Sequence, residues 1–595
     1  MLPLACSVAS LEDASLSTPK NHCQSNDDCA QGRCDPAQRV CVAESGQFST
    51  VLFEVTTPAT SSEFSGIRFI RTLEGVSSTG GTLDLDLDVV STVTGSVSPT
   101  RGAHQSDCEL SYEGSAKVPV KITLTPSERL LGLSTQVYAA ETQKVGGDEF
   151  GFSLKLPAGV YDLYVEPSTE VGGDGPLPCT VVPQLVREVK IAAGSVELPL
   201  VAQAPSVLKL KVQWPTPDLT DPLKNALTTL EGWTVDVIDP ATGRLLSATT
   251  VLSQTSTAGG YELYEGIVEY APVLGSPATL GKELVRLRPP SEVTAPTIVL
   301  ERGTLDAFGV GEALINHLGG VPQPISIVDS PVQSADGKLV AGTTTIKFVA
   351  REFGFLDPGT VFAFERTVES SDGKFSVDLL PGQYEVYVSP PAGSGLATTR
   401  TTMEIAKQPL TQTGKTLTVA AVSKVSGTVF SPTGSPLVGA SIYAVASPVL
   451  IDPLLLAAGT QPIKPLAMDA VVEPDGRFVV QADPGTFDFT VRADDRAGYA
   501  WLVRPNVTVQ TAAHDLSALT LSLPVAFQGS VSVPGVDSGE AVRVPVPGAL
   551  VRAFVYLNED GYTSDPKAAK SVLQIAETRA HPDGSFDLLL PSRLN

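Results

Sequence analysis

The sequence lacks any run of about 20 apolar residues, the length that a membrane-spanning helix needs, so we expect no such helix. Charged residues are also scarce: they make up 18% of the 595 residues, whereas 42% are hydrophobic. This balance predicts folded domains rather than disorder. Acidic residues outnumber basic ones by 65 to 41, which gives a formal net charge of −24. That charge argues against nucleic acid and anionic membranes as partners, because both attract cationic patches.

Recognisable catalytic motifs are missing as well. The sequence contains no H-E-x-x-H zinc motif and no G-x-S-x-G nucleophile elbow. The five histidines are far apart in the sequence, at positions His22, His104, His317, His514 and His581. We therefore predict a non-catalytic protein with no cofactor and no metal site.

A pattern of turn, strand, turn and strand recurs along the chain, and its clearest copy covers residues 372–388. Asp372-Gly373 supplies the positive φ that a two-residue hairpin turn needs. Apolar residues then alternate with polar ones, as in a half-buried strand, on both sides of a tight turn at Pro381-Gly382. Related copies cover residues 152–165 and 474–491, and an incomplete one covers 582–591.

Each copy has an upstream strand with a central glycine, such as Gly427 or Gly529. These two glycines lie about 100 residues apart, the length of one β-sandwich domain. The combination resembles the carboxypeptidase regulatory-like domain, a transthyretin-like β-sandwich. The resemblance is closest for residues 423–523 and extends to 93–200, 322–422 and 524–595. This family often forms repeated accessory modules on bacterial surface proteins, and it implies no active site.

The predicted fold is therefore all-β, with tandem Ig-like or transthyretin-like β-sandwiches after a small disulfide-rich segment. The predicted order is a tether (1–22), a Cys-rich knot (23–44), a β segment (45–92), a sandwich (93–200), a divergent sandwich (201–301), a connector (302–321), and three further sandwiches (322–422, 423–523 and 524–595).

Two parts of this order look incomplete. The 45–92 segment is short for a sandwich, so we expect it to pack on a neighbour. The last module stops before the strand that follows Pro-x-Gly-x-Tyr in its siblings, which would leave an open sheet edge. Either the sequence is incomplete at this end, which is the simpler option, or a partner supplies the strand.

Local patterns give four further expectations. The alternating run from Leu83 to Val89 favours a strand with one acidic face over a calcium loop, which needs a glycine at its sixth position. Short helices are predicted at 221–230 and 311–318. The apolar stretch 449–458 favours a short capping helix over an exposed contact patch.

Four of the seven cysteines fall within nineteen residues: Cys23, Cys29, Cys34 and Cys41. A segment this small cannot build a core, so we predict disulfides. Zinc is the rival interpretation, but paired C-x-x-C spacing is absent. Three pairings are possible, and a resemblance to small interleaved cysteine knots of secreted proteins implies Cys23–Cys34 and Cys29–Cys41. The run Asn26-Asp27-Asp28 favours a solvated acidic turn over a calcium site.

The other three cysteines are Cys6, Cys108 and Cys179. The last two lie in the 93–200 module, and a disulfide closing that loop of about 70 residues would contribute roughly 4 kcal/mol by loop entropy. Cys6 follows Leu4-Ala5 and resembles the lipid-acceptor cysteine of a bacterial lipobox. A basic start and an apolar core are missing before it, so either the true start lies upstream or Cys6 is an ordinary thiol. The odd cysteine count favours lipidation.

We therefore expect an exported protein of the bacterial outer membrane or cell surface, which contacts the membrane through its lipid alone. The expected function is a structural or protein-interaction array, similar to an adhesin or a stalk, with cell-envelope proteins or polysaccharide as partners. The alternative is a carbohydrate-binding surface protein with an exposed aromatic platform from Trp214, Trp233 or Trp501. For Trp214 and Trp233, a place in a sandwich core is the favoured expectation.

Overall fold

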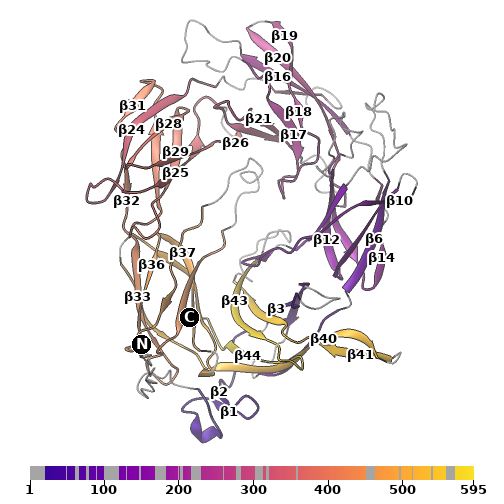
Figure 1. Cartoon of the computed structure of the whole chain (residues 1–595), viewed down its shortest axis with the longest axis vertical. Helices are drawn as coiled ribbons and strands as arrows, with labels where there is room; N and C mark the ends of the chain where they lie inside the picture. Colours follow the sequence, from indigo (N-terminus) through magenta and orange to yellow (C-terminus); the bar gives the residue numbers. More distant parts are fainter. Residues whose placement is uncertain are drawn as a thin grey trace, which may run out of the picture.

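The structure is a computed structural model of the whole chain (Figure 1). It describes residues 21–594 except for 49, 60–65, 75–79, 89, 99–119, 129, 147–148, 168–181, 199, 202–205, 216–228, 259, 276–282, 302–311, 316–320, 357–359, 450–462, 495–496, 512, 538–539 and 558–569. Within these stretches the helical residues are one turn of 3-10 helix, η1 (Asn26–Asp28), and Ala497, and all other regular structure is β-strand. No helix in the described stretches has the length and apolarity that a bilayer crossing requires. The predicted all-β class is confirmed.

One sandwich topology recurs in the five modules, which we number in chain order. The fourth module, which covers residues 423–523, shows it most completely. Its strands are β33 (Ser423–Phe430), β34 (Ser441–Ala446), β35 (Ala470–Val471), β36 (Arg477–Ala482), β37 (Gly485–Arg492), β38 (Leu502–Val509) and β39 (His514–Thr520). One sheet has the order β36-β33-β39, with β39 parallel to β33, and the other has the order β35-β34-β37-β38. The two inner faces enclose an apolar core that includes Phe478, Phe487 and Phe489.

The first module consists of β6 (Val90–Ser98), β7 (Val120–Pro126), β8 (Leu130–Leu131), β9 (Tyr138–Glu141), β10 (Gln143–Gly146), β11 (Glu149–Pro157), β12 (Gly159–Pro167), β13 (Gln184–Ile191), β14 (Ser195–Glu197) and β15 (Leu200–Val201). The second consists of β16 (Ser206–Pro215), β17 (Thr234–Ile238), β18 (Thr250–Val251), β19 (Ser253–Ala258), β20 (Tyr261–Tyr270), β21 (Leu284–Arg288), β22 (Thr297–Glu301) and β23 (Glu312–Ile315). The third consists of β24 (Ile325–Ser334), β25 (Thr344–Glu352), β26 (Val361–Ala363), β27 (Glu365–Ser370), β28 (Lys374–Leu379), β29 (Gly382–Ser389), β30 (Thr399–Ile405), β31 (Thr411–Thr413) and β32 (Leu417–Val419).

The repeated glycine of the upstream strand has a packing role. In the fifth module Gly529 lies opposite Phe586, and an added Cβ would lie 2.7 Å from the Phe586 ring and 1.8 Å from the Leu83 carbonyl oxygen. Gly427 faces Phe478 in the same way, because the two are cross-strand partners. A side chain at this position would displace the aromatic ring, so the glycine and the downstream phenylalanine form one recurrent packing unit.

The hairpin interpretation of the repeated pattern is wrong, although its strands are confirmed. Gly373 does adopt a positive φ of 68°, but the strands on either side of Pro381-Gly382 do not pair with each other. β28 pairs with β24 in one sheet, while β29 pairs with β25 and β30 in the other. The Pro-Gly turn therefore carries the chain from one sheet to the opposite one, across the core.

The predicted helix at 311–318 is also wrong for its described part. Residues 312–315 form β23, which pairs in parallel with β16 over Lys209–Val212. The second module therefore extends beyond the predicted boundary at 301 and includes part of the predicted connector. Pairing with an already formed sheet overrides the local preference of so short a segment. The helix predicted at 221–230 and the apolar stretch 449–458 lie almost entirely outside the described residues.

Strands from both ends of the chain form the fifth module. Its C-terminal strands are β40 (Pro524–Asp537), β41 (Glu540–Pro545), β42 (Leu550–Tyr556), β43 (Lys570–Arg579) and β44 (Ser585–Pro591). The others are β3 (Thr50–Thr56), β4 (Arg68–Glu74) and β5 (Gly81–Asp86), from the segment predicted to pack on a neighbour. β3 pairs with β42 as β37 pairs with β34, and β5 runs parallel to β40 as β39 does to β33.

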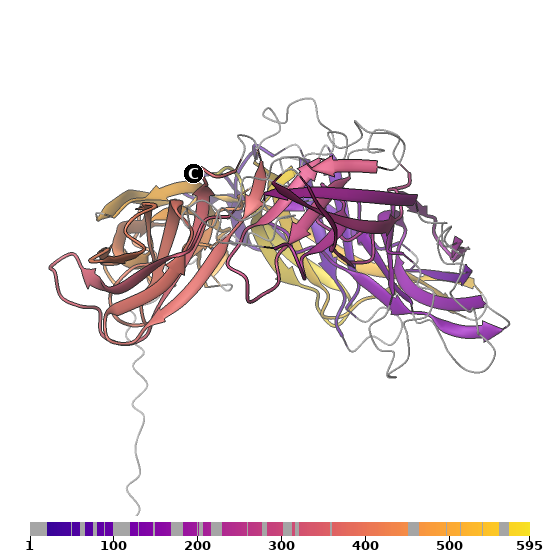
Figure 2. The same cartoon turned by 90° about the horizontal axis from the view of Figure 1, so that it is seen from above.

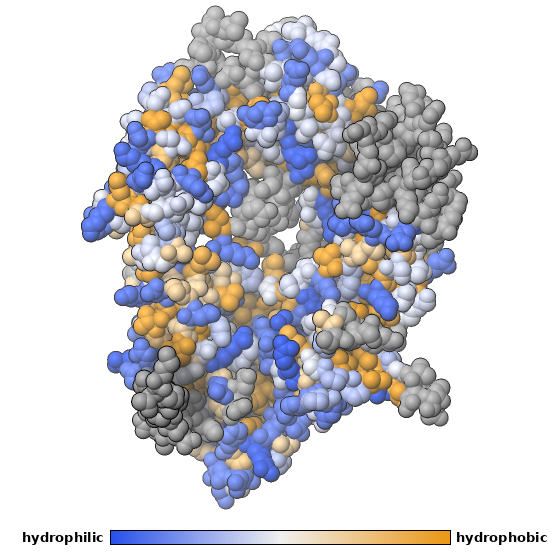
Figure 3. Space-filling view, in the orientation of Figure 1, coloured by the Kyte–Doolittle hydropathy of each residue, from blue (hydrophilic) through white to orange (hydrophobic). Residues whose placement is uncertain are grey.

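The five modules consequently follow one another around a ring, in which the indigo strand β3 lies beside the yellow strands β43 and β40 (Figure 1). Seen from above, the third and fourth modules lie on one side and the first on the other, with the fifth between them (Figure 2). Hydrophilic and hydrophobic residues intermingle over the face seen in Figure 3, which has a small central opening. The strands that the last module was expected to lack therefore come from the other end of the same chain.

The joints between modules are well packed. One continuous core runs from Tyr164 and Leu185 of the first module through the second module to Val419 of the third. β22 of the second module pairs with β26 of the third, which gives the two modules a shared sheet. Between the third and fourth modules, the buried carboxylate of Asp483 accepts the backbone N–H groups of Thr398 and Leu466, at 2.8 and 3.0 Å. Joints of this kind favour a rigid ring.

Candidate functional site: the ring closure and its disulfide knot

The ring closure is a continuous hydrogen-bonded sheet in which an N-terminal strand lies in the middle. β3 pairs with β4 on one side and with β42 on the other, in a five-stranded sheet of order β4-β3-β42-β43-β8. Its last strand, β8, comes from the first module and runs parallel to β43. The inner face of β3 places Val51, Phe53 and Val55 in a core that also contains Phe527 and Phe586 from the C-terminal strands. β3 and β4 therefore cover a core to which both ends of the chain contribute.

The second sheet is closed by β5. Leu83 and Leu85 are buried, whereas Asp84 is exposed, which confirms the predicted strand with one acidic face. Ser530 Oγ donates to Asp84 Oδ1 at 2.8 Å, and Ser532 Oγ donates to Asp86 Oδ1 at 2.6 Å. The acidic side chains of this strand therefore hydrogen-bond the partner strand from the other end of the chain.

A ladder of charges crosses the outer face of the closure sheet. Glu54, which is almost fully buried, pairs with Arg68 at 3.1 Å and with Arg552 at 3.5 Å. Arg552 in turn pairs with Glu577 at 2.9 Å. These four residues lie on four neighbouring strands, so the ladder joins the N-terminal pair of strands to the C-terminal pair.

The ladder has a consequence for the acid stability of the protein. Partial burial acts to raise the pKa of Glu577, but hydrogen bonds from Arg552 and Gln574 outweigh it and hold the pKa below its usual 4.5. A carboxylate with a lowered pKa stabilises the folded state above its unfolded pKa, and the stabilisation is lost as the pH falls. We expect the free energy of unfolding to decrease less steeply below about pH 4.5 in Glu577→Gln than in the wild type. Urea unfolding between neutral and acid pH measures this, and parallel wild-type and variant curves would contradict it.

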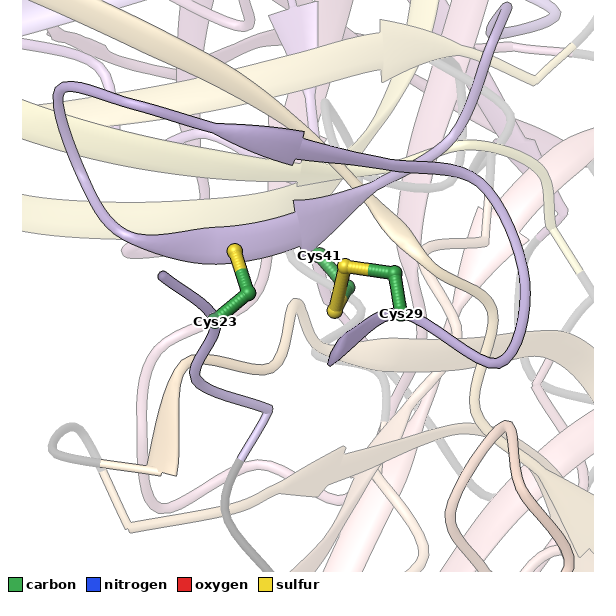
Figure 4. Close-up of side chains that lie close together, drawn as sticks. All are labelled: Cys23, Cys29 and Cys41. Carbon is green, nitrogen blue, oxygen red and sulfur yellow. A yellow bond between two sulfur atoms is a disulfide. The ribbon is translucent and has the colours of Figure 1, made fainter. Parts of the chain in front are cut away.

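The Cys-rich knot consists of η1, β1 (Arg33–Asp35) and β2 (Val40–Val42). Disulfides join Cys23 to Cys34 and Cys29 to Cys41, so the predicted pairing is confirmed. Figure 4 shows the Cys29–Cys41 bond with Cys23 beside it. The sulfur atoms of these three cysteines lie within 4.8 Å of one another, a cluster that also suits a metal ion, but here they are bonded as disulfides.

The acidic run of the knot forms a hydrogen-bonded turn. The Asp28 carboxylate accepts the backbone N–H groups of Gln24 and Ser25, at 2.7 and 2.8 Å, and these bonds lower its pKa. The Asn26 side-chain oxygen accepts the N–H of Cys34 at 2.8 Å. Two of the three polar side chains in this run therefore have structural partners in the knot itself.

The knot is docked where the fourth and fifth modules meet. Asn21 is buried and donates from its side chain to the carbonyl groups of Cys41 and Gly498, both at 2.8 Å. Gln38 donates to the carbonyl of Phe527 at 2.6 Å. Val40 and Val42 pack against Ala526 of β40. The knot thus contacts the fourth module and β40, and it precedes β3 in the sequence.

We expect Cys29→Ser/Cys41→Ser to loosen the knot without opening the ring. The disulfide closes a loop of about 12 residues, and its loss costs roughly 3 kcal/mol of local stability by loop entropy. Hydrogen exchange should accelerate over 21–47, with little change in β3 and β42. Accelerated exchange in β3 as well would show that the disulfide is needed for the closure itself.

The remaining predicted site residues lie partly outside the described stretches. Cys6, Cys108 and Cys179 lie outside the described residues, so their lipid and disulfide assignments stay predictions. Trp214 and Trp233 are buried in the second module, which confirms their place in a core and removes them from any exposed platform. Trp501 is half-buried, and the Arg492 guanidinium lies over its ring at 3.6 Å.

No family model matches the chain, and no curated protein matches it. Among solved structures, a streptococcal ancillary pilin is 13% identical, with 55% of this chain and 98% of that chain covered and a TM-score of 0.18. The full-length major pilin RrgB from Streptococcus pneumoniae is 11% identical, with 72% and 99% covered and a TM-score of 0.13. A putative adhesin from Bacteroides ovatus is 11% identical, with 39% and 91% covered and a TM-score of 0.18. These TM-scores are too low to support an argument about function.

Proposed function

We propose that this chain is an exported, non-catalytic structural and interaction protein of the bacterial cell surface. The observation that carries the proposal is the pair of disulfides in a knot docked beside the ring closure. Disulfides persist in oxidising compartments and are reduced in the cytosol. A structural role for both bonds therefore fits a protein that works outside the cytoplasm.

The ring suits a scaffold whose loops and sheet edges contact partners. Its joints combine shared sheets, shared cores and buried charge pairs, so the modules hold fixed positions relative to one another. A rigid scaffold loses little conformational entropy when a partner binds. The acidic net charge keeps such a protein soluble. The proposed partners are cell-envelope proteins or polysaccharide.

Anchoring through a lipid on Cys6 is the second part of the proposal. The motif Leu4-Ala5-Cys6 and the odd cysteine count support it. Several acyl chains on one residue give stable membrane anchoring, whereas one chain gives only reversible binding. Residues 7–20, which include four serines, would then be a short tether between the membrane and the knot.

The intact mass of the N-terminal peptide, measured on protein extracted from its native membranes, tests export and anchoring together. The expected result is a lipid-modified Cys6 at the new N-terminus, with Cys23 and Cys41 resistant to alkylation until a reductant is added. A peptide that runs through Met1 with Cys6 unmodified would contradict the anchor. Alkylation of Cys23 and Cys41 without reductant would contradict export.

A carbohydrate-binding role has no comparable support. Trp214 and Trp233 are buried, whereas Trp501 has Arg492 over one face of its ring and packs against the core of the fifth module. A sugar platform requires exposed aromatic faces, which Trp214 and Trp233 do not provide.

A further inference from the structure

A cleft of about 380 Å³ lies between β4 of the fifth module and the turn that joins β11 to β12 in the first. One wall is formed by five consecutive residues of β4, from Arg68 to Thr72. The opposite wall includes the turn from Pro157 to Tyr161. β4 is the last strand of its sheet, so the cleft runs along an open sheet edge.

The hydrogen bonds at one end of β4 show which backbone groups face the cleft. The Arg68 N–H donates to the side chain of Gln136 at 3.1 Å, and the Tyr138 hydroxyl donates to the Arg68 carbonyl at 3.4 Å. Ile67, one residue earlier, instead bonds Thr57 on the β3 side. Backbone groups alternate in direction along a strand, and β4 pairs with β3 without a bulge. The N–H and C=O groups of Ile70 and Thr72 therefore point away from β3, into the cleft.

The equivalent edge is covered in two other modules. In the second module the corresponding strand is β22, and it pairs with β26 of the next module. In the first module it is β13, where the Arg187 N–H donates to the Leu274 carbonyl at 2.9 Å and the Leu274 N–H donates to the Leu185 carbonyl at 3.0 Å. In both cases an extended segment of the following module lies along the edge. Among the described residues, no strand pairs with β4 on the side to which Ile70 and Thr72 direct their backbone groups.

We propose that this cleft binds an extended segment of a partner polypeptide, which adds to β4 as a further strand. The side chains at the cleft define the chemistry of that segment. Ile70 and Val160 are 38% and 42% exposed and offer apolar contacts. Asp86, Asp88 and Glu128 give the lining an acidic character, although Arg68 and Arg71 also belong to it. The segment that fits alternates apolar and basic residues.

This inference rests on the proposed interaction role and specifies its partner, but it does not depend on export or on the lipid anchor. The probe is a fluorescent peptide of about nine residues in which valine alternates with lysine. A second peptide of the same charge, with proline replacing every valine, is the control, because proline cannot donate to a ladder. We expect saturable binding of the first peptide only, and slower hydrogen exchange over 68–74 of the full-length protein.

Two matched variants test the role of the edge. Thr72→Pro removes a backbone donor that faces the cleft and leaves the bonds to β3 in place, whereas Thr72→Val changes the side chain alone. Loss of one such hydrogen bond corresponds to about tenfold weaker binding, so we expect this weakening for Thr72→Pro and not for Thr72→Val. Equal binding of the two peptides, or unchanged exchange over 68–74 of the wild type, would overturn the proposal. Full protection of Ile70 and Thr72 before peptide is added would also overturn it, by showing that the chain itself covers this edge.

Discussion

Replacing Phe53 with alanine is expected to destabilise β42 and β44, although these strands lie at the opposite end of the chain. Phe53 is fully buried and shares a core with Phe527 and Phe586. Truncation of a buried phenylalanine costs about 3–5 kcal/mol, which includes the cavity left behind. Hydrogen exchange resolved by segment measures the effect, and exchange should accelerate in both 50–86 and 524–591.

Phe478→Ala is the matched control for this variant. Phe478 is equally buried, but its core belongs to the fourth module, which is formed by one continuous stretch of chain. Its truncation should accelerate exchange within 423–520 and leave 50–86 nearly unchanged. If Phe53→Ala affected only residues near it in the sequence, the result would contradict a fifth module that is formed by both ends of the chain.

Asp239→Ala is expected to be the most destabilising charge removal at the joint between the first and second modules. Asp239 is fully buried and accepts two hydrogen bonds of 2.7 Å from the Arg187 guanidinium, whose side chain is 11% exposed. Removing one partner of a buried ion pair costs about 3–5 kcal/mol, because the other charge stays buried. The lower end of that range is expected, since Asp162 remains 3.4 Å from Arg187. Urea unfolding measures the loss.

An exposed pair provides the control for this prediction. Asp475 and Arg477 lie 3.5 Å apart, with side chains 54% and 75% exposed. Exposed ion pairs contribute at most about 1 kcal/mol, so Arg477→Ala, which keeps the hydrogen bond from the residue 477 N–H to Asp475, should leave the unfolding curve almost unchanged. An equal loss of unfolding free energy in Asp239→Ala and in this control would mean that burial does not determine how much an ion pair stabilises the protein.

The sequence predicts the individual strands better than their partners. The alternation from Leu83 to Leu87 identifies a strand with one buried face, and the structure confirms it. A period of two shows which side chains are buried, but it carries no information on which edge the strand joins. The short 45–92 segment and the incomplete last module were both visible in the sequence. That the two segments form one module together could not be predicted, because they lie at opposite ends of the chain.

The same limitation applies to the closure site. Glu54 interrupts an apolar run, Val51-Leu52-Phe53, which is a visible signal for a buried charge. Its partners Arg68 and Arg552 become neighbours only when the sheet forms. The disulfide pairing was implied by a resemblance to small cysteine knots, whereas the docking of Asn21 against Gly498 has no local signature.

A cysteine cross-link between the two ends of the chain within the fifth module tests the ring closure most directly. Asp84 and Ser530 are paired residues of β5 and β40, and their side-chain oxygens lie 2.8 Å apart. Ser326 and Asp378, whose side-chain oxygens lie 2.7 Å apart within the third module, are the matched control. Each pair is replaced by cysteines in the full-length protein, which is oxidised, digested and analysed by mass spectrometry.

We expect Asp84→Cys/Ser530→Cys to form a disulfide within a monomer, with a yield similar to that of Ser326→Cys/Asp378→Cys. Joined peptides from the two ends of one chain would establish that the ring is closed by its own N-terminal strands. Free thiols at both positions, while the control pair cross-links fully, would contradict the closed ring.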